Sequence, residues 1–428
     1  MTEHKPLVSI GLPVYNGEKY IAEAIESLLS QDYTNIEIII SDNASTDNTP
    51  QICQQYQQKD PRIQYLQNHT NIGAANNFNR TFELSKGDFF MWAAFDDLRH
   101  PTYISKCMQK LNQHPDAFIC VTGSIFIDEE GKLVSGENWL IETINLSLSK
   151  RLHHYFLNLS WIGLNVYGLW RSKYLKQTRL FLEEYGPDVI LGLELYLLGD
   201  VVKVEESLFF YRQFREKKHY DLIKTITSTY EKQQLMAQAP YTQLIKNLYQ
   251  TLKEKNVSQE ITQDFFDVLV FQQMDYVRIC CLEHQSLFKD HILDPEYIYE
   301  FLKILVTTEK SPEQIIVSLE NTEDKFKKLG EKRPILLLGS LQVSVILMWK
   351  YFKDKNIPIH AMIEESSLYS QPNFYENLIN MSELTTRPFF IVASLQPHIH
   401  IESLIKNGYE HRKDFLYVGL NTPYLYLL

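Results

Sequence analysis

Short apolar runs and amphipathic segments alternate over roughly the first 120 residues. The runs that predict buried strands are 7–12, 36–40, 63–66, 89–95 and 118–122. Between them, apolar residues recur every three or four positions, as in 21–29, which predicts helices with one buried face. Strand, helix and strand at this spacing predict an α/β fold with right-handed crossovers and a mainly parallel sheet.

Polar, turn-forming residues follow four of these strands directly. These stretches are 13–16, 42–43, 68–73 and 96–97. Ligands of such sheets bind outside the carboxyl ends of the strands, and these ends meet at one edge. The pattern therefore predicts a site at that edge.

Two adjacent carboxylates, Asp96 and Asp97, lie at the end of the fourth run. They would repel each other unless a proton or a cation neutralises them, and Mg²⁺ or Mn²⁺ holding a diphosphate suits their oxygens. The alternative is that Asp97 caps the helix that follows. The chain has neither GxxxxGK[ST] nor GxGxxG after its first strand, which favours binding of a diphosphate through a metal.

Two residues at the other strand ends are candidates for binding a nucleoside. Asp42 is suited to accept hydrogen bonds from a base or a ribose, and an Asx turn is the alternative. Tyr15 is suited to stack on a base, and simple packing is the alternative.

Three stretches resemble family-2 glycosyltransferases of the GT-A fold. They are VSIGLPVYNGEKYIAEAIESLL (8–29), EIIISDNASTDNT (37–49) and NIGAANNFNRTFELSKGDFFMWAAFDDLRHP (71–101). The resemblance extends over about the first 215 residues and implies sugar transfer from a nucleotide-diphosphate-sugar with inversion at the anomeric carbon. The residues it assigns to the donor nucleotide are Pro13, Tyr15, Asn16, Asp42, Asn71, Gly73 and Asp96.

The acidic pair departs from the family pattern at its first position. The usual Asp-Ala-Asp-Asp is Ala94-Phe95-Asp96-Asp97 here, so the first acid is lost. The resemblance then implies Asp97 as the metal ligand and Asp96 as a contact of the ribose or the metal.

Residues 185–212 resemble the acceptor-side helix of the family and the Tyr-Arg that follows it. Asp188 falls on the aspartate of the family's Glu-Asp pair, and Pro187 replaces the glutamate. The resemblance implies Asp188 as the base that takes the proton of the acceptor hydroxyl. Helix capping by Asp188 and the competing acid Glu194 remain alternatives.

The family's third metal ligand is also changed. A histidine two residues after the Tyr-Arg is Phe214 here, and His219 could replace it only if the loop bends. Arg212 and the basic residues of 215–218 are expected to help neutralise the diphosphate, with a solvated loop as the alternative for that basic cluster.

Composition narrows the function classes. With 42 basic and 53 acidic residues the net charge is −11, which argues against a large nucleic-acid surface. The five cysteines form no CxxC pair, which argues against a disulfide-built secreted protein and a cysteine zinc site. No signal peptide or membrane-spanning stretch is expected, so we expect a cytoplasmic protein, with peripheral association at the inner face of the membrane as an option.

The second half is less informative. We expect a GT-A domain over 1–220, a helical connecting region over 221–330 and a small Rossmann-like α/β domain over 331–428. In the last of these, the pattern predicts strands at 334–339, 357–363 and 388–393, helices at 340–355 and 401–408, and a polar loop at 396–400. The main functional hypothesis is a metal-dependent glycosyltransferase that acts on a glycan or lipid-linked acceptor in cell-surface polysaccharide biosynthesis. A decayed, glycosyltransferase-like binding or scaffold protein is the alternative. An NAD(P)-linked enzyme would need a glycine fingerprint that the C-terminal part lacks.

Overall fold

The computed structural model describes residues 5–137, 142–159, 162–214 and 240–272. Later in the chain it describes 303–305, 307–308, 335–339, 359–363, 389–392, 404, 407–408 and 415–417. The chain divides into two compact units, Met1–Asn256 and Val257–Leu428. The predicted boundaries at 220 and 330 both lie outside the described residues.

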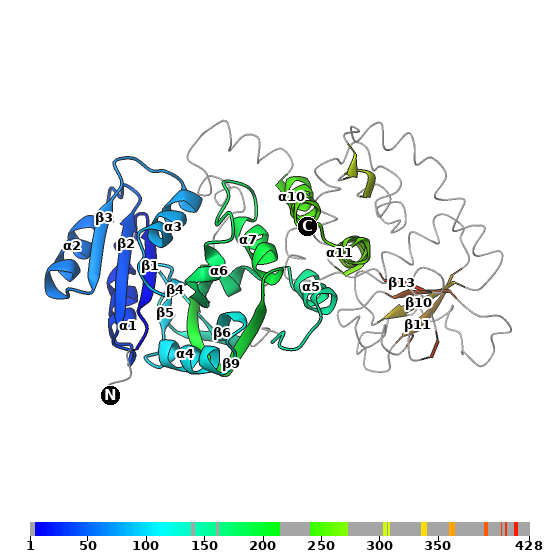
Figure 1. The fold of residues 1–428 in the computed structure, drawn as a ribbon, viewed down its shortest axis with the longest axis horizontal. Coiled ribbons are helices and arrows are strands. Elements are labelled where there is room, and N and C mark those ends of the chain that lie inside the picture. The colour runs from blue at the N-terminus through cyan, green and yellow to red at the C-terminus, as the bar shows by residue number, and fades with distance from the viewer. Residues whose placement is uncertain are drawn as a thin grey trace. The chain divides into compact units, whose positions relative to one another are not determined.

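The first unit is built on one mixed, mainly parallel sheet (Figure 1), as predicted. Its strands are β1 (Val8–Val14), β2 (Ile36–Asp42), β3 (Ile63–Gln67), β4 (Phe89–Trp92), β5 (Leu98–Arg99), β6 (Ala117–Ile127), β7 (Leu133–Glu137), β8 (Leu169–Arg171) and β9 (Asp200–Arg212). Their order is β3-β2-β1-β4-β8-β6-β9-β5, with β7 paired to β6. The four neighbouring strands β3, β2, β1 and β4 are all parallel, so their carboxyl ends lie at one edge.

The helices of the first unit pack on this sheet or on one another. They are α1 (Ile21–Leu29), α2 (Thr49–Lys59), α3 (Ala74–Glu83), α4 (Tyr103–Gln113), α5 (Leu148–Leu157), the 3₁₀ helix η1 (Ile162–Tyr167), α6 (Ser172–Leu175), α7 (Pro187–Tyr196) and α10 (Pro240–Glu254). In α1 the stripe Ile21, Ile25 and Leu28 is buried, as its spacing predicts. α3 packs on β1 and β2, and α4 packs on β6 and β9.

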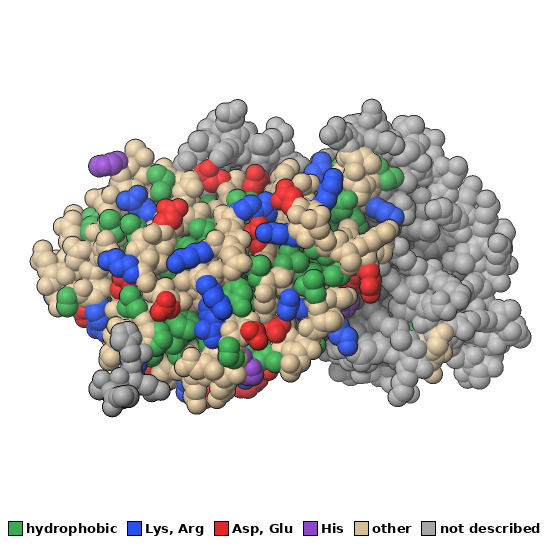
Figure 2. Space-filling view, in the orientation of Figure 1, with side chains coloured by type: hydrophobic (Ala, Val, Ile, Leu, Met, Phe, Trp, Pro, Cys, Tyr) green, Lys and Arg blue, Asp and Glu red, His purple; other side chains and the backbone are tan. Residues whose placement is uncertain are grey.

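The strand bodies form the core. Every residue of β1 is buried, and Ile38, Ile40 and Met91 are fully enclosed beside it. Full burial of one such side chain contributes roughly 1.5–3 kcal/mol, so this core holds the strand ends in fixed positions. On the face drawn in Figure 2, acidic and basic side chains are interspersed.

The fourth strand is shorter than predicted. β4 ends at Trp92, whereas the apolar run extends to residue 95. The main chain turns there, and the N–H of Asp97 donates to the carbonyl of Ala94 at 3.4 Å. Ala94 and Phe95 are therefore part of the turn that carries the two carboxylates.

β9 is the largest element that the sequence pattern does not predict. Its pairing with β6 shifts register between Val204 and Ser207, where Glu205 and Glu206 stand exposed. This irregularity interrupts the alternation of apolar and polar residues that marks a strand.

The described part of the second unit contains α11 (Gln259–Gln272) and a parallel sheet in the order β11 (Ile359–Ile363), β10 (Ile335–Gly339), β12 (Phe389–Val392) and β13 (Phe415–Tyr417). Three of these strands fall on runs that predict strands. The expected helix at 340–355 and the polar loop at 396–400 lie outside the described residues, as does most of the expected helix at 401–408. No helix in the described part of either unit is both long and apolar enough to cross a bilayer.

Candidate functional site

Three strand ends meet where the sequence places its polar stretches. Val14 pairs with Asp42, and the N–H of Asn43 donates to the carbonyl of Val14 at 2.8 Å. On the other side of β1, the N–H of Ala93 donates to the carbonyl of Gly11 at 2.8 Å. The loops after β1, β2 and β4 therefore adjoin one another.

The loops after β1 and β2 are cross-linked. Asn16 has a positive φ of 51°, its N–H donates to Ser45 Oγ at 2.9 Å, and its side-chain oxygen accepts from the N–H of Thr46 at 2.9 Å. Tyr15 directly precedes Asn16 in the chain and is 44 % exposed. Its exposure does not fit the packing alternative and leaves ring surface on which a base can stack.

Asp42 is fully buried and accepts two hydrogen bonds. The N–H of Ser45 donates to Oδ1 at 2.8 Å, and the hydroxyl of Tyr65 donates to Oδ2 at 2.7 Å. Burial, followed by this bond to Asp42, raises the pKa of Tyr65 far above its ordinary value, so the phenol stays a donor. The Asx turn that was the alternative role for Asp42 is therefore present. Contact of Asp42 with a nucleoside remains a prediction.

The side chain of Asn43 connects several loops through hydrogen bonds, and the sequence pattern does not predict this role. Its side chain donates to Asn71 Oδ1 at 2.9 Å and accepts from the N–H of Ile72 at 2.9 Å and from Asn68 Nδ2 at 3.1 Å. These bonds fix the segment that leads to Gly73, whose φ of 82° suits glycine. The repeated asparagines at 43, 68 and 71, all at strand ends, were the available signal.

Residues 94–97, which we call the acidic turn, do not cap a helix. Asp97 is 4 % exposed and is followed directly by β5, while α4 begins at Tyr103 after its N-cap residue Thr102. The main-chain N–H of Arg212 donates to Asp97 Oδ1 at 2.9 Å. The capping alternative for Asp97 is therefore wrong, and the end of β9 orients this carboxylate.

Arg212 is hydrogen-bonded to this turn and is 3 % exposed. Its guanidinium pairs with Glu23 at 2.8 Å and donates to three carbonyls, those of Asp96 (2.8 Å), Asp128 (3.0 Å) and Glu129 (3.3 Å). Nearby, Phe214 packs edge-on against Tyr20 with ring centres 5.7 Å apart. His219 and the basic residues 215–218 lie outside the described residues.

Tyr167 shows that the acidic turn and Asp188 share one place. Tyr167 is the last residue of η1, and η1 contacts both β4 and α7. Burial raises the pKa of Tyr167 well above its ordinary value, and the carboxylates of Asp97, Asp96 and Asp188 add to this rise. η1 therefore places Tyr167 between the strand that leads to the acidic turn and the helix that carries Asp188. No pattern in the sequence identifies Tyr167 as part of the site.

Asp188 is the second residue of α7, after Pro187 at its start and Gly186 at the N-cap. Burial raises the pKa of its carboxyl group above the ordinary 3.8, although hydrogen bonds from the main chain of Val189 and of Asp188 itself oppose the rise. These bonds show that Asp188 also contacts the helix start. A carboxyl group with a raised pKa is a stronger base, which suits proton removal.

Glu194, the competing acid, is already engaged elsewhere. It is 2 % exposed, pairs with the guanidinium of Arg179 and accepts from the N–H of Arg179 at 2.9 Å. Arg179 in turn donates to Thr251 on α10 at 2.8 Å. This arrangement joins α7 to α10 and favours Asp188 over Glu194 as the base.

We expect Glu194→Gln to lower the free energy of unfolding by about 1–3 kcal/mol, because it removes a charge from a buried, charge-assisted contact. Turnover per folded molecule should change little. Urea denaturation and kcat measured on the folded fraction test the two parts. A large loss of kcat in a fully folded Glu194→Gln would contradict the structural role.

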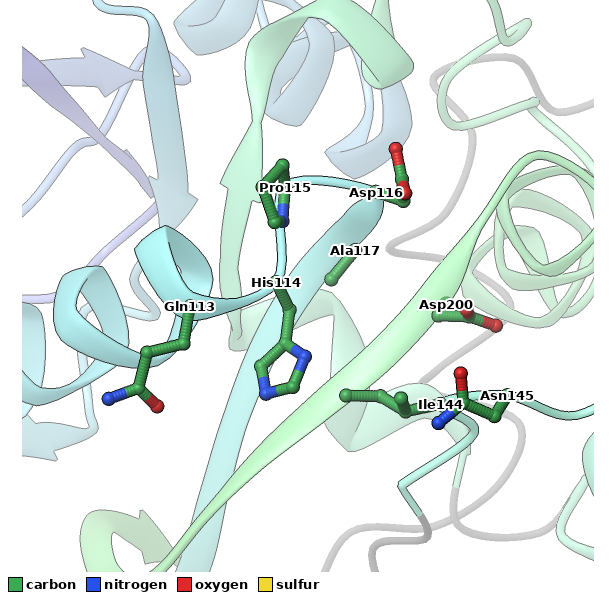
Figure 3. A pocket seen from close by; sticks show the side chains of 8 residues that line it. All are labelled: Gln113, His114, Pro115, Asp116, Ala117, Ile144, Asn145 and Asp200. Carbon is green, nitrogen blue, oxygen red and sulfur yellow. The ribbon is translucent and has the colours of Figure 1, made fainter.

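A small pocket lies at the opposite edge of the sheet (Figure 3). It encloses about 150 Å³ where β6 and β9 begin, and its lining includes His114, Asp116, Asn145 and Asp200. Because β6 and β9 run in the same direction as β1, this pocket lies at the amino ends of the strands, away from the acidic turn. None of the predicted site residues lines it.

The N-terminal part of the chain is similar to known glycosyltransferases. Residues 9–175 match the family model described as glycosyl transferase family 2. The chondroitin synthase of Escherichia coli is 34 % identical over 153 residues, which are 35 % of this chain and 22 % of that protein. Glycosyltransferase GlyG of Streptococcus pneumoniae is 27 % identical over 214 residues, or 48 % of this chain and 71 % of that protein.

A third relative is the GalNAc(5)-diNAcBac-PP-undecaprenol beta-1,3-glucosyltransferase of Campylobacter jejuni. It is 28 % identical over 211 residues, which are 49 % of this chain and 64 % of that enzyme. Among solved structures, TarS of S. aureus superposes with a TM-score of 0.43 at 18 % identity, over 73 % of this chain and 55 % of that chain. The family match, which spans β1 to β8 and the acidic turn, identifies residues 9–175 as a glycosyl transferase family 2 domain.

Proposed function

We propose that the first unit is an inverting glycosyltransferase that moves a sugar from a nucleotide-diphosphate-sugar to a glycan or lipid-linked acceptor in cell-surface polysaccharide biosynthesis. The observation that carries the proposal is that η1, which ends in Tyr167, contacts both β4, which leads into the turn with Asp96 and Asp97, and α7, which carries Asp188. The names of the relatives support the substrate class, since one is a chondroitin synthase and another acts on an undecaprenol-linked glycan.

The donor nucleotide would lie across the ends of β1, β2 and β4. The exposed ring of Tyr15 would stack on the base, while Pro13, Asn16, Asp42, Asn71 and Gly73 shape the surrounding loops. Asp96 would contact the ribose or the metal. This arrangement would place the diphosphate next to the acidic turn.

The donor set suits a divalent cation that is shared with the diphosphate. Among the described residues, no three His, Cys, Asp or Glu side chains are placed to form a metal cage. Mg²⁺ and Mn²⁺ are hard cations, and Mg²⁺ commonly binds through one or two carboxylates and completes its shell with substrate phosphates. Asp97, with Asp96, would hold the ion, which when bound would neutralise charge on the leaving diphosphate.

Asp188 would act on the acceptor. Its carboxylate would take the proton of the acceptor hydroxyl while the oxygen forms a bond to the anomeric carbon and the bond to the diphosphate breaks. The diphosphate leaves with the bonding electrons. One displacement inverts the anomeric carbon, so one carboxylate suffices as base.

We expect a nucleoside diphosphate to raise the melting temperature of the full chain, and Mn²⁺ to increase the effect. A ligand at 100 times its Kd adds about 2.7 kcal/mol of stability. The experiment compares UDP, GDP, CDP and dTDP, each with Mn²⁺ or EDTA, with NAD and NADP alongside. Stabilisation by NAD or NADP alone, with no response to any diphosphate, would refute the proposal.

The second candidate is a binding protein that has lost catalysis. Two observations favour it: Ala94 stands where the family has its first acid, and Phe214 packs against Tyr20 where the family has a histidine. Mn²⁺-dependent stabilisation by a diphosphate, without release of that diphosphate from any matching nucleotide-sugar, would support this candidate.

A further inference from the structure

Arg212 is an arginine whose donors are turned toward the protein. Its side chain is 1 % exposed, and its guanidinium makes four hydrogen bonds to protein oxygens. A guanidinium has five N–H donors, so one at most is left for a phosphate. The ring of Tyr20 also covers it, with its centre 4.6 Å from the guanidinium carbon. These contacts do not suit the expected direct contact with a diphosphate.

The bonds of Arg212 converge on the acidic pair from two directions. Its main-chain N–H donates to Asp97 Oδ1 at 2.9 Å, and its Nε donates to the carbonyl of Asp96 at 2.8 Å. The first bond sets the direction of one carboxylate, and the second fixes the main chain that carries the other. A single residue at the end of β9 thus holds both.

The other end of the same guanidinium reaches two separate elements. Nη1 donates to the carbonyls of Asp128 and Glu129, just after β6, and Nη2 pairs with Glu23 on α1 at 2.8 Å. Only a planar fork with several donors can make these contacts together, and a lysine ammonium cannot reproduce them. The acidic turn is therefore fastened to α1 and to the end of β6 through one side chain.

We infer that Arg212 is a positioning residue: it orients Asp96 and Asp97 for a divalent cation and does not contact the diphosphate. The inference rests on the proposed function. Residues that orient metal ligands typically change metal affinity by about 10- to 100-fold when they are replaced. Glu23 balances the charge of Arg212 and belongs to the same hydrogen-bond network. The side chain of Glu23 is 54 % exposed.

The test measures binding of Mn²⁺ and of diphosphate separately by titration calorimetry. We expect Arg212→Lys to weaken Mn²⁺ binding, at a saturating concentration of the diphosphate that stabilises the wild-type protein, by about 10- to 100-fold. Diphosphate binding at saturating Mn²⁺ should change by less than about threefold, since no donor to it is lost. The reverse pattern, with weaker diphosphate binding and unchanged Mn²⁺ binding, would overturn the inference.

Two further variants guard against misfolding. Glu23→Gln should weaken Mn²⁺ binding in the same direction by a smaller factor, and it carries the test if Arg212→Lys does not fold. Glu26→Gln, on the same helix and bonded to Tyr56, is the matched control and should leave Mn²⁺ binding unchanged. An unchanged Mn²⁺ affinity in a folded Glu23→Gln, when Arg212→Lys is unfolded, counts against the inference.

Hydrogen exchange separates failure of this inference from failure of the proposed function. If no diphosphate binds the wild-type protein, the proposed function fails. The positioning role of Arg212 is then tested by amide exchange in the acidic turn without any ligand. We expect Arg212→Lys, or Glu23→Gln in its place, to speed amide exchange across 93–97 while protection in β1 is retained. Unchanged exchange in this turn would overturn the positioning role.

Discussion

Asp188→Asn is expected to lower kcat by roughly 100- to 10,000-fold, the usual contribution of a general base. Binding of the donor should change by less than about threefold, because Asp188 lies at the start of α7 and not in the loops after β1 and β2. Asparagine keeps the size of the side chain and can still accept the hydrogen bonds at the helix start. Steady-state kinetics with the donor and acceptor found by screening provide the measurement.

The pH profile gives a second readout of the same residue. Burial raises the pKa of Asp188 above 3.8, so kcat/KM of the wild-type protein should fall, as pH is lowered, through a pKa above that value. Asp188→Asn should lack this acidic limb. Because the folded-state pKa is raised, the protonated group favours the folded state at low pH, and this contribution is lost as pH rises through the raised pKa. Full activity in Asp188→Asn would reject the assignment.

Glu194→Gln is the matched control for Asp188→Asn. The two acids lie on the same helix, but Glu194 is bound to Arg179, whereas Asp188 bonds to the main chain at the start of the helix. Glu194→Gln should lower the stability of the fold and leave kcat nearly unchanged. Asp188→Asn should lower kcat and leave the stability nearly unchanged. This opposite behaviour distinguishes a base from an acid that only supports the fold.

The parts of the site that the sequence predicts are those that short-range patterns determine. β1 and β2 are buried parallel strands, which read as apolar runs, and the turns after them need residues such as Asn16 and Asp42. The parallel sheet then brings their ends together. Fold class and the edge that carries the site therefore follow from local pattern and handedness alone.

The parts of the site that the sequence does not predict depend on contacts between segments far apart in the chain. Arg212 meets Glu23 across 189 positions of sequence, and no periodicity predicts that pairing. The network around Asn43 is also long-range, since Asn71 is 28 residues away. A sequence pattern can say that these residues are polar and lie near strand ends. Which of them face a ligand and which bind one another is decided by packing.

Asp97→Asn is expected to reduce kcat/KM by roughly 1,000-fold, because charge stabilisation at a metal site contributes several kcal/mol and each 1.4 kcal/mol is a factor of ten. The substitution is conservative for the fold. The amide oxygen of asparagine can still accept the N–H of Arg212, so the turn and the end of β9 should keep their contact. The negative charge is the feature that is lost.

Binding measurements distinguish a metal ligand from a group that only shapes the turn. Asp97→Asn should lose most of the extra thermal stabilisation that Mn²⁺ gives to the diphosphate complex, and EDTA should have the same effect on the wild-type protein. Asp116→Asn removes an exposed carboxylate at the opposite edge of the sheet and should change neither property. If Asp97→Asn keeps full Mn²⁺-dependent activity, the cation is held elsewhere, and the acidic turn at the end of β4 does not bind it.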